Sequence, residues 1–323
     1  MSNKLLVVCG QTGTGKTSLA FYLADIFDGE LVSADSRQVY KKLDIGTGKD
    51  LLKDSKYDRR GYYDVGGIRI WGYDLVGPKA AFSLGRYLRF AKRAIKDIYK
   101  RDKLPILVGG TGLYIKGVID GIPTAIVPKN AILRKNLSGK TPEELFEILA
   151  QLDPIKAGSL NHSDKGNPRR LIRAIEVAQW KLELSHRRMP LILKEKQDTL
   201  FIGLTAPKEI ISEKIDKRVD KRIAQGLEEE IKELLTSGVK WEMQSMSSLG
   251  YRQWKGYFQK QNTYQEVVEN WKKEEKRYAR RQLTWFKKDK RIKWFDISKK
   301  NFVKNVEKLV RKWYPSGRKN EKG

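Results

Sequence analysis

The stretch that decides the fold of this chain runs Lys4-Leu5-Leu6-Val7-Val8-Cys9-Gly10-Gln11-Thr12-Gly13-Thr14-Gly15-Lys16-Thr17. An unbroken apolar run ends in the pattern G-x-x-x-x-G-K-T, and residues 18–27 then carry apolar side chains at helical spacing. This order predicts a buried strand, a glycine-rich phosphate loop and a helix. The glycines let successive N–H groups turn toward one anion, Lys16 adds a positive charge, and Thr17 offers a hydroxyl to Mg²⁺. We therefore expect the eight residues from Gly10 to Thr17 to bind a di- or triphosphate.

The composition indicates a polyanionic partner. The 323 residues include 66 Lys and Arg against 39 Asp and Glu, which gives a formal net charge of +27. Nucleic acid is the partner that such a strong positive charge favours. With 40% apolar residues, the chain can bury one large core or two smaller ones.

Membrane and zinc proteins are disfavoured by the same sequence. No apolar run approaches about 18 residues, the length of a membrane span, and no signal or lipidation motif opens the chain. We therefore expect a cytoplasmic protein without membrane contact. We also expect a monomer. The single cysteine, Cys9, cannot form an internal disulfide, and with only two histidines in the chain it provides no structural zinc site.

Two further strand ends carry candidate site residues. Residues 30–35 form a short apolar strand that ends in Asp35, and in an open α/β sheet this end of a strand faces the ligand. Asp35 is a proton acceptor, a Mg²⁺ ligand or only the cap of a turn with Ser36. A second buried strand, residues 104–108, ends in a glycine-rich strand-to-helix turn at residues 109–114 that brings backbone close to a ligand or is only a structural turn. Lys49, in a loop broken by glycines, is another anion contact or a solvated lysine.

The alternation of strands and helices stops near residue 121. Helical patterns around residues 143–151 and 168–181 predict a helical insertion domain over residues 122–198, which leaves 1–121 and 199–323 as the core domain. Within the insertion, Arg169 and Arg173 are spaced i, i+4, which suits phosphate recognition or an ordinary solvated face. Residues 200–204 then predict a last core strand.

The C-terminal third is basic and aromatic. Residues 264–288 read as one helix, on which an aromatic stripe is expected to pack inward, namely Tyr264, Val267, Trp271, Tyr278 and Trp285. The opposite side carries a basic ridge that fits a phosphate backbone, or is a solvated face: Lys273, Lys276, Arg280 and Lys287. In the helix that follows the strand at residues 200–204, Arg218 and Arg222 share a face, from which one of them can reach a leaving phosphate.

The predicted fold is therefore α/β. It has a parallel sheet like that of P-loop NTPases, with helices on both faces, a helical insertion domain and a basic helical C-terminal part. From the residues alone, a small-molecule or nucleoside kinase and a nucleic-acid-dependent ATPase remain alternatives.

Seven sequence blocks together resemble the family of bacterial tRNA dimethylallyltransferases, also called tRNA isopentenyltransferases. They follow the family's order between residues 5 and 290, and they are residues 10–17, 35–40, 44–47, 108–114, 169–176, 250–253 and 278–286. The chain departs from the family pattern twice. Gly48-Lys49-Asp50 stands where Ala-Lys-Pro is usual, and residues 70–75 replace the usual His-His-Leu-Ile-Asp run.

The resemblance implies an activity and its partners. It implies transfer of a dimethylallyl group from dimethylallyl diphosphate to the exocyclic N6 amine of the adenosine 3′-adjacent to the anticodon in tRNA, with release of diphosphate. It also implies Mg²⁺ as cofactor and the tRNA anticodon stem-loop as partner.

The resemblance further assigns roles to residues. Asp35 is the proton acceptor, Thr111 and Arg218 act at the reacting centre, and residues 10–17 bind diphosphate with Mg²⁺ on Thr17. The residues implied to contact tRNA are Asp35, Ser36, Arg37, Gln38, Arg169, Arg170 and Arg173, to which the basic ridge adds Lys276 and Arg280. Because His162 and His186 both fall in the predicted insertion or at its exit, a carboxylate at a strand end is the better candidate base.

Overall fold

The computed structural model describes residues 3–49, 51, 55–183 and 197–315. Its internal contacts divide the chain into two compact units. The first unit comprises residues 1–120 and 195–323, and the second comprises residues 121–194. Each unit is described separately. Within the described ranges, no helix is long and apolar enough to cross a membrane.

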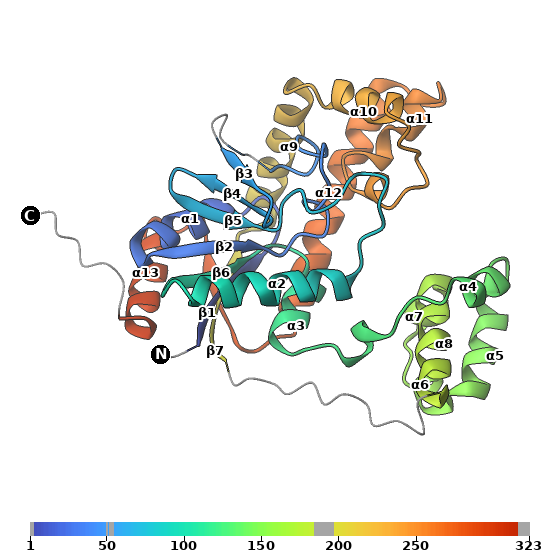
Figure 1. The fold of residues 1–323 in the computed structure, drawn as a ribbon. Coiled ribbons are helices and arrows are strands. Elements are labelled where there is room, and N and C mark those ends of the chain that lie inside the picture. Colours follow the sequence, from blue (N-terminus) through green and yellow to red (C-terminus); the bar gives the residue numbers. More distant parts are fainter. Residues whose placement is uncertain (1–2, 50, 52–54, 184–196, 316–323) are drawn as a thin grey trace, which may run out of the picture. The chain divides into compact units, whose positions relative to one another are not determined.

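The first unit is built on a sheet with the strand order β3-β4-β5-β2-β6-β1-β7-β8 (Figure 1). All neighbouring pairs from β5 to β8 are parallel, whereas β3, β4 and β5 pair antiparallel. The strands are β1 (Lys4–Gly10), β2 (Gly29–Ser33), β3 (Lys56–Asp58), β4 (Tyr62–Val65), β5 (Ile68–Trp71), β6 (Leu104–Val108), β7 (Asp198–Thr205) and β8 (Ile292–Asp296).

Helices cover both faces of this sheet (Figure 1). Alternate side chains of β1 point to opposite faces, so that Leu5 and Val7 join one hydrophobic core and Leu6 and Val8 join the other. The first core is completed by α2 (Leu84–Tyr99), α3 (Gly112–Ile119), α9 (Lys208–Ala224), α10 (Leu227–Thr236) and α12 (Tyr264–Phe286). The second is completed by α1 (Lys16–Phe27) and α13 (Phe302–Trp313).

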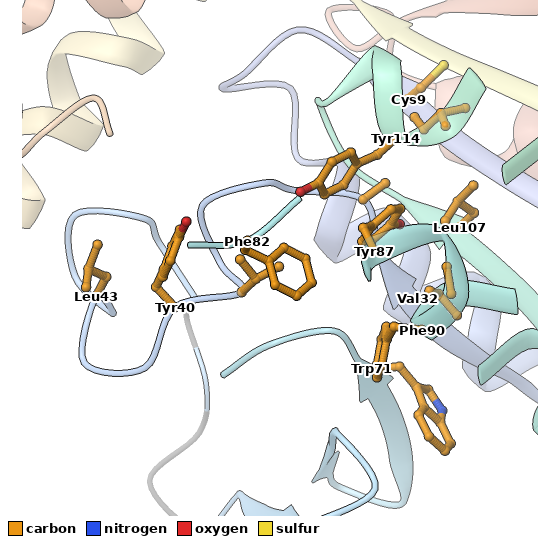
Figure 2. Close-up of a cluster of buried hydrophobic side chains, with 14 of the residues drawn as sticks. Cys9, Val32, Tyr40, Leu43, Trp71, Phe82, Tyr87, Phe90, Leu107 and Tyr114 are labelled. Carbon is orange, nitrogen blue, oxygen red and sulfur yellow. The ribbon is translucent and has the colours of Figure 1, made fainter. Parts of the chain in front are cut away.

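The first core fixes α2 and α3, the helices that precede and follow β6 in the chain. The ring of Tyr87 on α2 stacks on the ring of Tyr114 on α3, with centroids 3.7 Å apart (Figure 2). The Tyr87 hydroxyl donates a hydrogen bond of 3.0 Å to the carbonyl oxygen of Ser33 at the end of β2. Tyr40 and Leu43, from the loop after β2, are buried in the same core. Burial and stacking therefore hold the backbone around the end of β2 in place.

Two expectations about the first unit need correction. Residues 200–204 were expected to be the last strand of the core, but β8 follows and pairs parallel to β7. Lys49 is neither solvated nor an anion contact, because it is buried and ion-paired with Asp44, at 2.6 Å, and with Asp74. Asp50, in the same departure from the family pattern, lies outside the described residues.

Gly48, the first residue of the same departure from the family pattern, stands in place of the usual alanine for a steric reason. Its φ is 64°, a left-handed conformation that favours glycine. A Cβ at this position would lie 2.2 Å from Nη2 of Arg222, so the alanine that is usual here would displace the arginine. Glycine at position 48 therefore leaves the space that the Arg222 side chain occupies.

The second unit is helical. Its helices are α4 (Ala131–Leu137), α5 (Pro142–Leu152), α6 (Pro154–Gly158), α7 (His162–Lys165) and α8 (Pro168–Glu183), after a 3-10 turn at Pro123–Ile126. The two helical patterns of the sequence are found as α5 and α8, whereas the short helices were not predicted. A core of Leu145, Leu149, Leu171 and Ile175 joins α5 to α8.

Candidate active site

The site lies at the carboxyl edge of the sheet. The ends of β1, β2 and β6 are in register there, because Val8 and Ser33 both lie opposite Val108. A cavity of about 790 Å³ opens at this edge. The loops that follow the three strands line it with residues 12, 13 and 15–18, residues 35–38, and residues 109 and 110. The sheet thus brings together the three segments that the sequence singled out.

The phosphate loop presents Lys16 and Thr17 to the cavity. Gly15 has a φ of 75° and turns the chain into α1, which begins at Lys16. The Lys16 ammonium donates a hydrogen bond of 2.6 Å to the carbonyl oxygen of Gln11. Desolvation, and then the charge of Arg218, lower the pKa of Lys16 to about 8, while the carboxylate of Asp35 acts in the opposite direction. A bound anion would favour the charged form of this lysine.

Three residues assigned to the diphosphate site do not line the cavity: Gly10, Gln11 and Thr14. Gly10 is required by packing, since a Cβ there would lie 2.2 Å from the carbonyl oxygen of Leu204. Gln11 and Thr14 are buried, and the Thr14 hydroxyl donates a hydrogen bond of 2.8 Å to the Gln11 carbonyl oxygen. These three residues therefore help to fix the conformation of the phosphate loop without lining the cavity.

Asp35 is half-buried and lines the cavity. Its Oδ1 accepts a hydrogen bond of 2.8 Å from the backbone N–H of Arg37, so the turn-capping role that the sequence left open is present. The hydrogen bond occupies one carboxylate oxygen, and the residue still faces the site. Asp35 can therefore cap the turn and still act on a ligand in the cavity.

The residues after Asp35 are held by their own contacts. Arg37 donates hydrogen bonds to the Gln244 carbonyl oxygen at 2.9 Å and to the Ser247 hydroxyl at 3.1 Å. Gln38 is buried; it accepts from the Ser33 hydroxyl at 2.9 Å and donates to the Gly48 carbonyl oxygen at 3.1 Å. Both residues line the cavity together with Ser36.

Thr111 lies next to this turn and outside the cavity lining. Its hydroxyl accepts a hydrogen bond of 3.1 Å from the Ser36 N–H, and its own N–H donates to the Ala34 carbonyl oxygen at 3.0 Å. Thr111 therefore joins the turn after β6 to the turn that carries Asp35.

Arg218 lines the cavity from α9. Its Nη2 donates to the Glu275 carboxylate of α12 at 3.0 Å, while its buried Nε has no hydrogen-bond partner among the described residues. Glu275 is buried and also lies 3.6 Å from Nη1 of Arg222. One carboxylate thus holds two arginines at the cavity.

Gln282 is a site residue that the sequence reasoning missed. Its Oε1 accepts a hydrogen bond of 2.7 Å from the Thr12 N–H of the phosphate loop. Its Nε2 donates to the Gly110 carbonyl oxygen at 3.0 Å. A buried side chain of α12 therefore bridges two of the three segments that line the cavity.

The predicted inward stripe of α12 is partly wrong. Tyr264 and Trp285 are 43% and 46% exposed. The buried residues of this helix are Val267, Trp271, Glu275, Ala279, Gln282 and Phe286. The two polar members were overlooked because the stripe was traced through aromatic residues. The spacing of four, four, four, three and four residues between buried positions is the signal that would have found them.

The residues predicted to contact tRNA have different surroundings. On α12, Arg280 is exposed, whereas Lys276 is ion-paired with Asp216 of α9 at 2.7 Å. On α8, Arg169 is exposed and Arg170 is ion-paired with Asp164. Their contacts with tRNA stay predictions.

Arg173 has a structural role within the second unit. It donates hydrogen bonds to the carbonyl oxygens of Thr124 at 2.6 Å and Val127 at 2.9 Å. It also donates to the carboxylate of Glu176 at 3.0 Å. The two arginines predicted as an i, i+4 pair on α8 therefore have different roles. Arg169 faces solvent, whereas Arg173 anchors the turn before α4.

The cavity also contains oxygen donors of the kind that Mg²⁺ prefers. Thr17 contributes a hydroxyl and Asp35 a carboxylate, and magnesium completes such a protein donor set with water and phosphate oxygens. The described residues contain no group of three or more His, Cys, Asp and Glu side chains that would form a protein-only cage. The donor set fits an ion held largely by its phosphate ligand.

A phosphate loop that faces a carboxylate and arginines across one cavity defines a class of α/β enzymes that bind a di- or triphosphate. Two family models match this chain, IPP transferase over residues 38–289 and isopentenyl transferase over residues 3–70. The chain belongs to the IPP transferase family. The match confirms the predicted family, and with it a prenyltransferase as the enzyme class.

Individual relatives agree with this assignment. The tRNA dimethylallyltransferase of Anoxybacillus flavithermus is 38% identical over 303 residues, which cover 92% of each chain. That of Carboxydothermus hydrogenoformans is 35% identical and covers 96% of this chain and 97% of its own. The crystal structure of the full-length tRNA isopentenylpyrophosphate transferase from Bacillus halodurans matches with a TM-score of 0.71 at 28% identity, over 97% of each chain. The predicted fold class is confirmed.

Proposed function

We propose that this enzyme transfers a dimethylallyl group from dimethylallyl diphosphate to the exocyclic N6 amine of the adenosine 3′-adjacent to the anticodon in tRNA. The observation that carries this proposal is that one cavity is lined by Lys16, Thr17, Asp35 and Arg218 together. The family assignment supplies the reaction class, and the names of the relatives supply tRNA as the acceptor. The formal charge of +27 suits a polyanionic acceptor.

In the proposed reaction, the bond between the allylic carbon and the diphosphate oxygen breaks, and a bond forms between that carbon and N6 of adenosine. The bond electrons leave with diphosphate, and the amine loses one proton. Asp35 is the group that we assign to accept this proton, because it is a half-buried carboxylate in the cavity lining. The adenosine must leave its stack in the loop to enter the cavity.

The leaving diphosphate is bound by the phosphate loop and by Arg218. The N–H groups of residues 13 and 15–17, the Lys16 ammonium and the Arg218 guanidinium all suit an anion that gains charge as the bond breaks. Mg²⁺ held by Thr17 would neutralise phosphate charge. Lys16 would exchange its hydrogen bond to the Gln11 carbonyl oxygen for a phosphate oxygen.

We assign tRNA contacts to the second unit as well. Arg169 supports this because it is exposed on α8, whereas Arg173 is already used within the unit. Arg169→Ala is expected to weaken tRNA binding without changing diphosphate affinity. Lys135→Ala, at an exposed position of α4, is the matched control. An unchanged tRNA affinity in Arg169→Ala would remove this residue from the interface.

The decisive experiment changes Asp35 to Asn. The amide keeps the size and one acceptor oxygen of the side chain, so the turn to Arg37 is expected to survive while the base is lost. Single-turnover prenyl transfer should slow by about 10²- to 10⁴-fold, with little change in the affinity for either substrate.

A Mg²⁺ ligand would behave differently. If Asp35→Asn binds diphosphate poorly and regains the parental rate at high Mg²⁺ concentration, the base assignment is wrong. A parental rate under all conditions would leave Asp35 with its turn-capping role alone. Incubation of the parent enzyme with ATP alone, and with dimethylallyl diphosphate and tRNA, separates the proposed reaction from a kinase or an ATPase.

A further inference from the structure

One carboxylate of α10 anchors the loop that follows β2. Glu230 is half-buried, and its Oε2 accepts hydrogen bonds of 2.8 Å from the backbone N–H groups of both Asp44 and Ile45. Its Oε1 accepts a further hydrogen bond of 3.4 Å from the Gly46 N–H. Successive backbone N–H groups that converge in this way bind negative charge. Because the protein itself supplies the anion, the arrangement fixes the loop to the helix.

Tyr251 completes this anchor. Its hydroxyl donates a hydrogen bond of 2.6 Å to Oε1 of Glu230, and the residue is fully buried. Its ring lies against the loop backbone, because a Cβ on Gly46 would lie 2.4 Å from Cε2 of the ring. Hydrogen bonding and packing therefore act together to hold the loop at Gly46.

The anchored loop forms part of the cavity wall and holds Gln38. Gly46, Thr47, Gly48 and Gln38 all line the cavity. Nε2 of Gln38 donates to the carbonyl oxygens of Thr47 at 3.4 Å and Gly48 at 3.1 Å, while Oε1 accepts from the Ser33 hydroxyl at 2.9 Å. Carbonyl oxygens only accept hydrogen bonds, so the loop fixes which end of the amide faces it. Both Nε2 hydrogens are then used, and one lone pair of Oε1 is left for a ligand.

This loop lies away from the phosphate loop along the cavity. A Cβ on Gly13 of the phosphate loop would lie 3.8 Å from Cβ of Lys214, at one end of the lining part of α9. A Cβ on Gly48 would lie 2.2 Å from Nη2 of Arg222, at the other end. These two α9 residues are eight positions apart, about 12 Å along the helix axis. A shift of the anchored loop should therefore leave the diphosphate site largely intact.

We propose that Glu230 is a positioning residue for acceptor selection. It holds the loop at residues 44–48, the loop orients the Gln38 amide, and Oε1 of Gln38 accepts a hydrogen bond from an exocyclic amine of the acceptor RNA. This inference rests on the proposed function, because it places a base of the acceptor in the same cavity. An amide held in one orientation distinguishes an amine donor from a carbonyl acceptor, whereas an amide that is free to flip satisfies either.

The test measures how the full chain discriminates between two anticodon stem-loop RNAs. Inosine replaces one loop adenosine at a time, which exchanges an exocyclic amine for a carbonyl oxygen. At one position, the parent should bind the inosine RNA about 5- to 100-fold more weakly, because two acceptors then face each other. In Glu230→Gln, which loses the charge and one acceptor oxygen, this ratio should fall by at least about threefold. Diphosphate affinity should stay within about twofold of the parent.

A double-mutant cycle separates positioning from a general structural role. Gln38→Met should abolish the discrimination, and adding Glu230→Gln to it should then change the ratio no further. Glu229→Gln, an exposed neighbour on the same helix, is the matched control and should discriminate like the parent. Tyr251→Phe keeps the ring against Gly46 and removes only one hydrogen bond, so its ratio should fall less than that of Glu230→Gln.

Three results would overturn the proposal. They are a parental ratio in Glu230→Gln, an equal effect of Glu230→Gln in the Gln38→Met background, and a loss of diphosphate affinity as large as the loss of discrimination. If Glu230→Gln does not fold, Tyr251→Phe decides the question, and a parental ratio in that variant overturns the proposal.

The outcome is separable from the proposed function. If the parent transfers the prenyl group and Glu230→Gln discriminates like the parent, the positioning role fails and the function stands. If the parent transfers nothing but loses its discrimination through Glu230 and Gln38, the positioning role stands and the proposed reaction fails.

Discussion

The Gln282 bridge should matter for diphosphate binding as well as for stability. Gln282→Met keeps the length and burial of the side chain but removes both hydrogen bonds, to the Thr12 N–H at 2.7 Å and the Gly110 carbonyl oxygen at 3.0 Å. Thr12 is half-buried at the cavity, so water can replace its lost partner in part. Gly110 is buried, and an unsatisfied buried group costs about 1 to 3 kcal/mol. We expect the free energy of unfolding to fall by about 1 to 3 kcal/mol.

The same change should loosen the phosphate loop before ligand binds. Binding of diphosphate must then also order the loop backbone around Thr12, and we expect the diphosphate affinity to fall by about tenfold, equivalent to about 1.4 kcal/mol. Gln282→Glu separates the two bonds, because a carboxylate still accepts from Thr12 but has no donor for the Gly110 carbonyl oxygen. Its charge also opposes the diphosphate, so its affinity should fall below that of Gln282→Met.

The assay combines calorimetric diphosphate titration, single-turnover prenyl transfer and denaturant unfolding. Gln253→Met is the matched control, since Gln253 is buried, accepts one hydrogen bond from the Gly250 N–H at 3.0 Å and does not line the cavity. This control should lose stability alone. If Gln282→Met also loses stability alone, with parental diphosphate affinity and transfer rate, the bridge supports the fold and does not position the loop.

Two further predictions concern charge. Burial alone would raise the pKa of Glu176, but hydrogen bonds from Arg134 and Arg173 lower it to about 2. Its stabilising contribution is therefore fully present above the ordinary carboxyl value of 4.5 and is lost as the pH falls toward about 2. Amide-exchange protection of α4 and α8 should decline over that window, and a parallel decline in Glu176→Gln would contradict the assignment. In RNA binding, Arg280→Ala should flatten the slope of log K against log salt by about 0.7 to 0.9. Lys276→Ala should flatten it less, because Asp216 already pairs with this lysine at 2.7 Å; equal changes would mean that the pair opens on RNA.

The part of the site that the sequence predicts well is the part made by strand ends. The phosphate loop, Asp35 and the glycine-rich turn that begins at Gly109 each follow directly from a buried strand. Parallel strands bring their carboxyl ends to one edge, so three local patterns are enough to place the three segments together. No knowledge of long-range packing is required for this step.

The parts that could not be predicted depend on distant contacts. Gln282 acts on residues 270 and 172 positions away in the chain, and no local pattern encodes such a pairing. The strand β8 was missed because it lies at the edge of the sheet, where only Ile292 is buried and the apolar signal is weak. Lys49 was misread because its partners Asp44 and Asp74 come together only when the loop after β2 packs against the chain after β5.

The polar side of α12 explains why its pattern misled and why the helix matters. A helix that packs only on a hydrophobic core has an apolar inner face, whereas α12 also borders a cavity and places Glu275 and Gln282 among its buried residues. Glu275 holds Arg218, and Gln282 holds the phosphate loop. The same helix also carries the exposed Arg280, for which we predict a tRNA contact. Because one helix would then contact both substrate sites, the separation between them is set by helix geometry, and any bend between residues 275 and 285 should impair transfer more than the binding of either substrate alone.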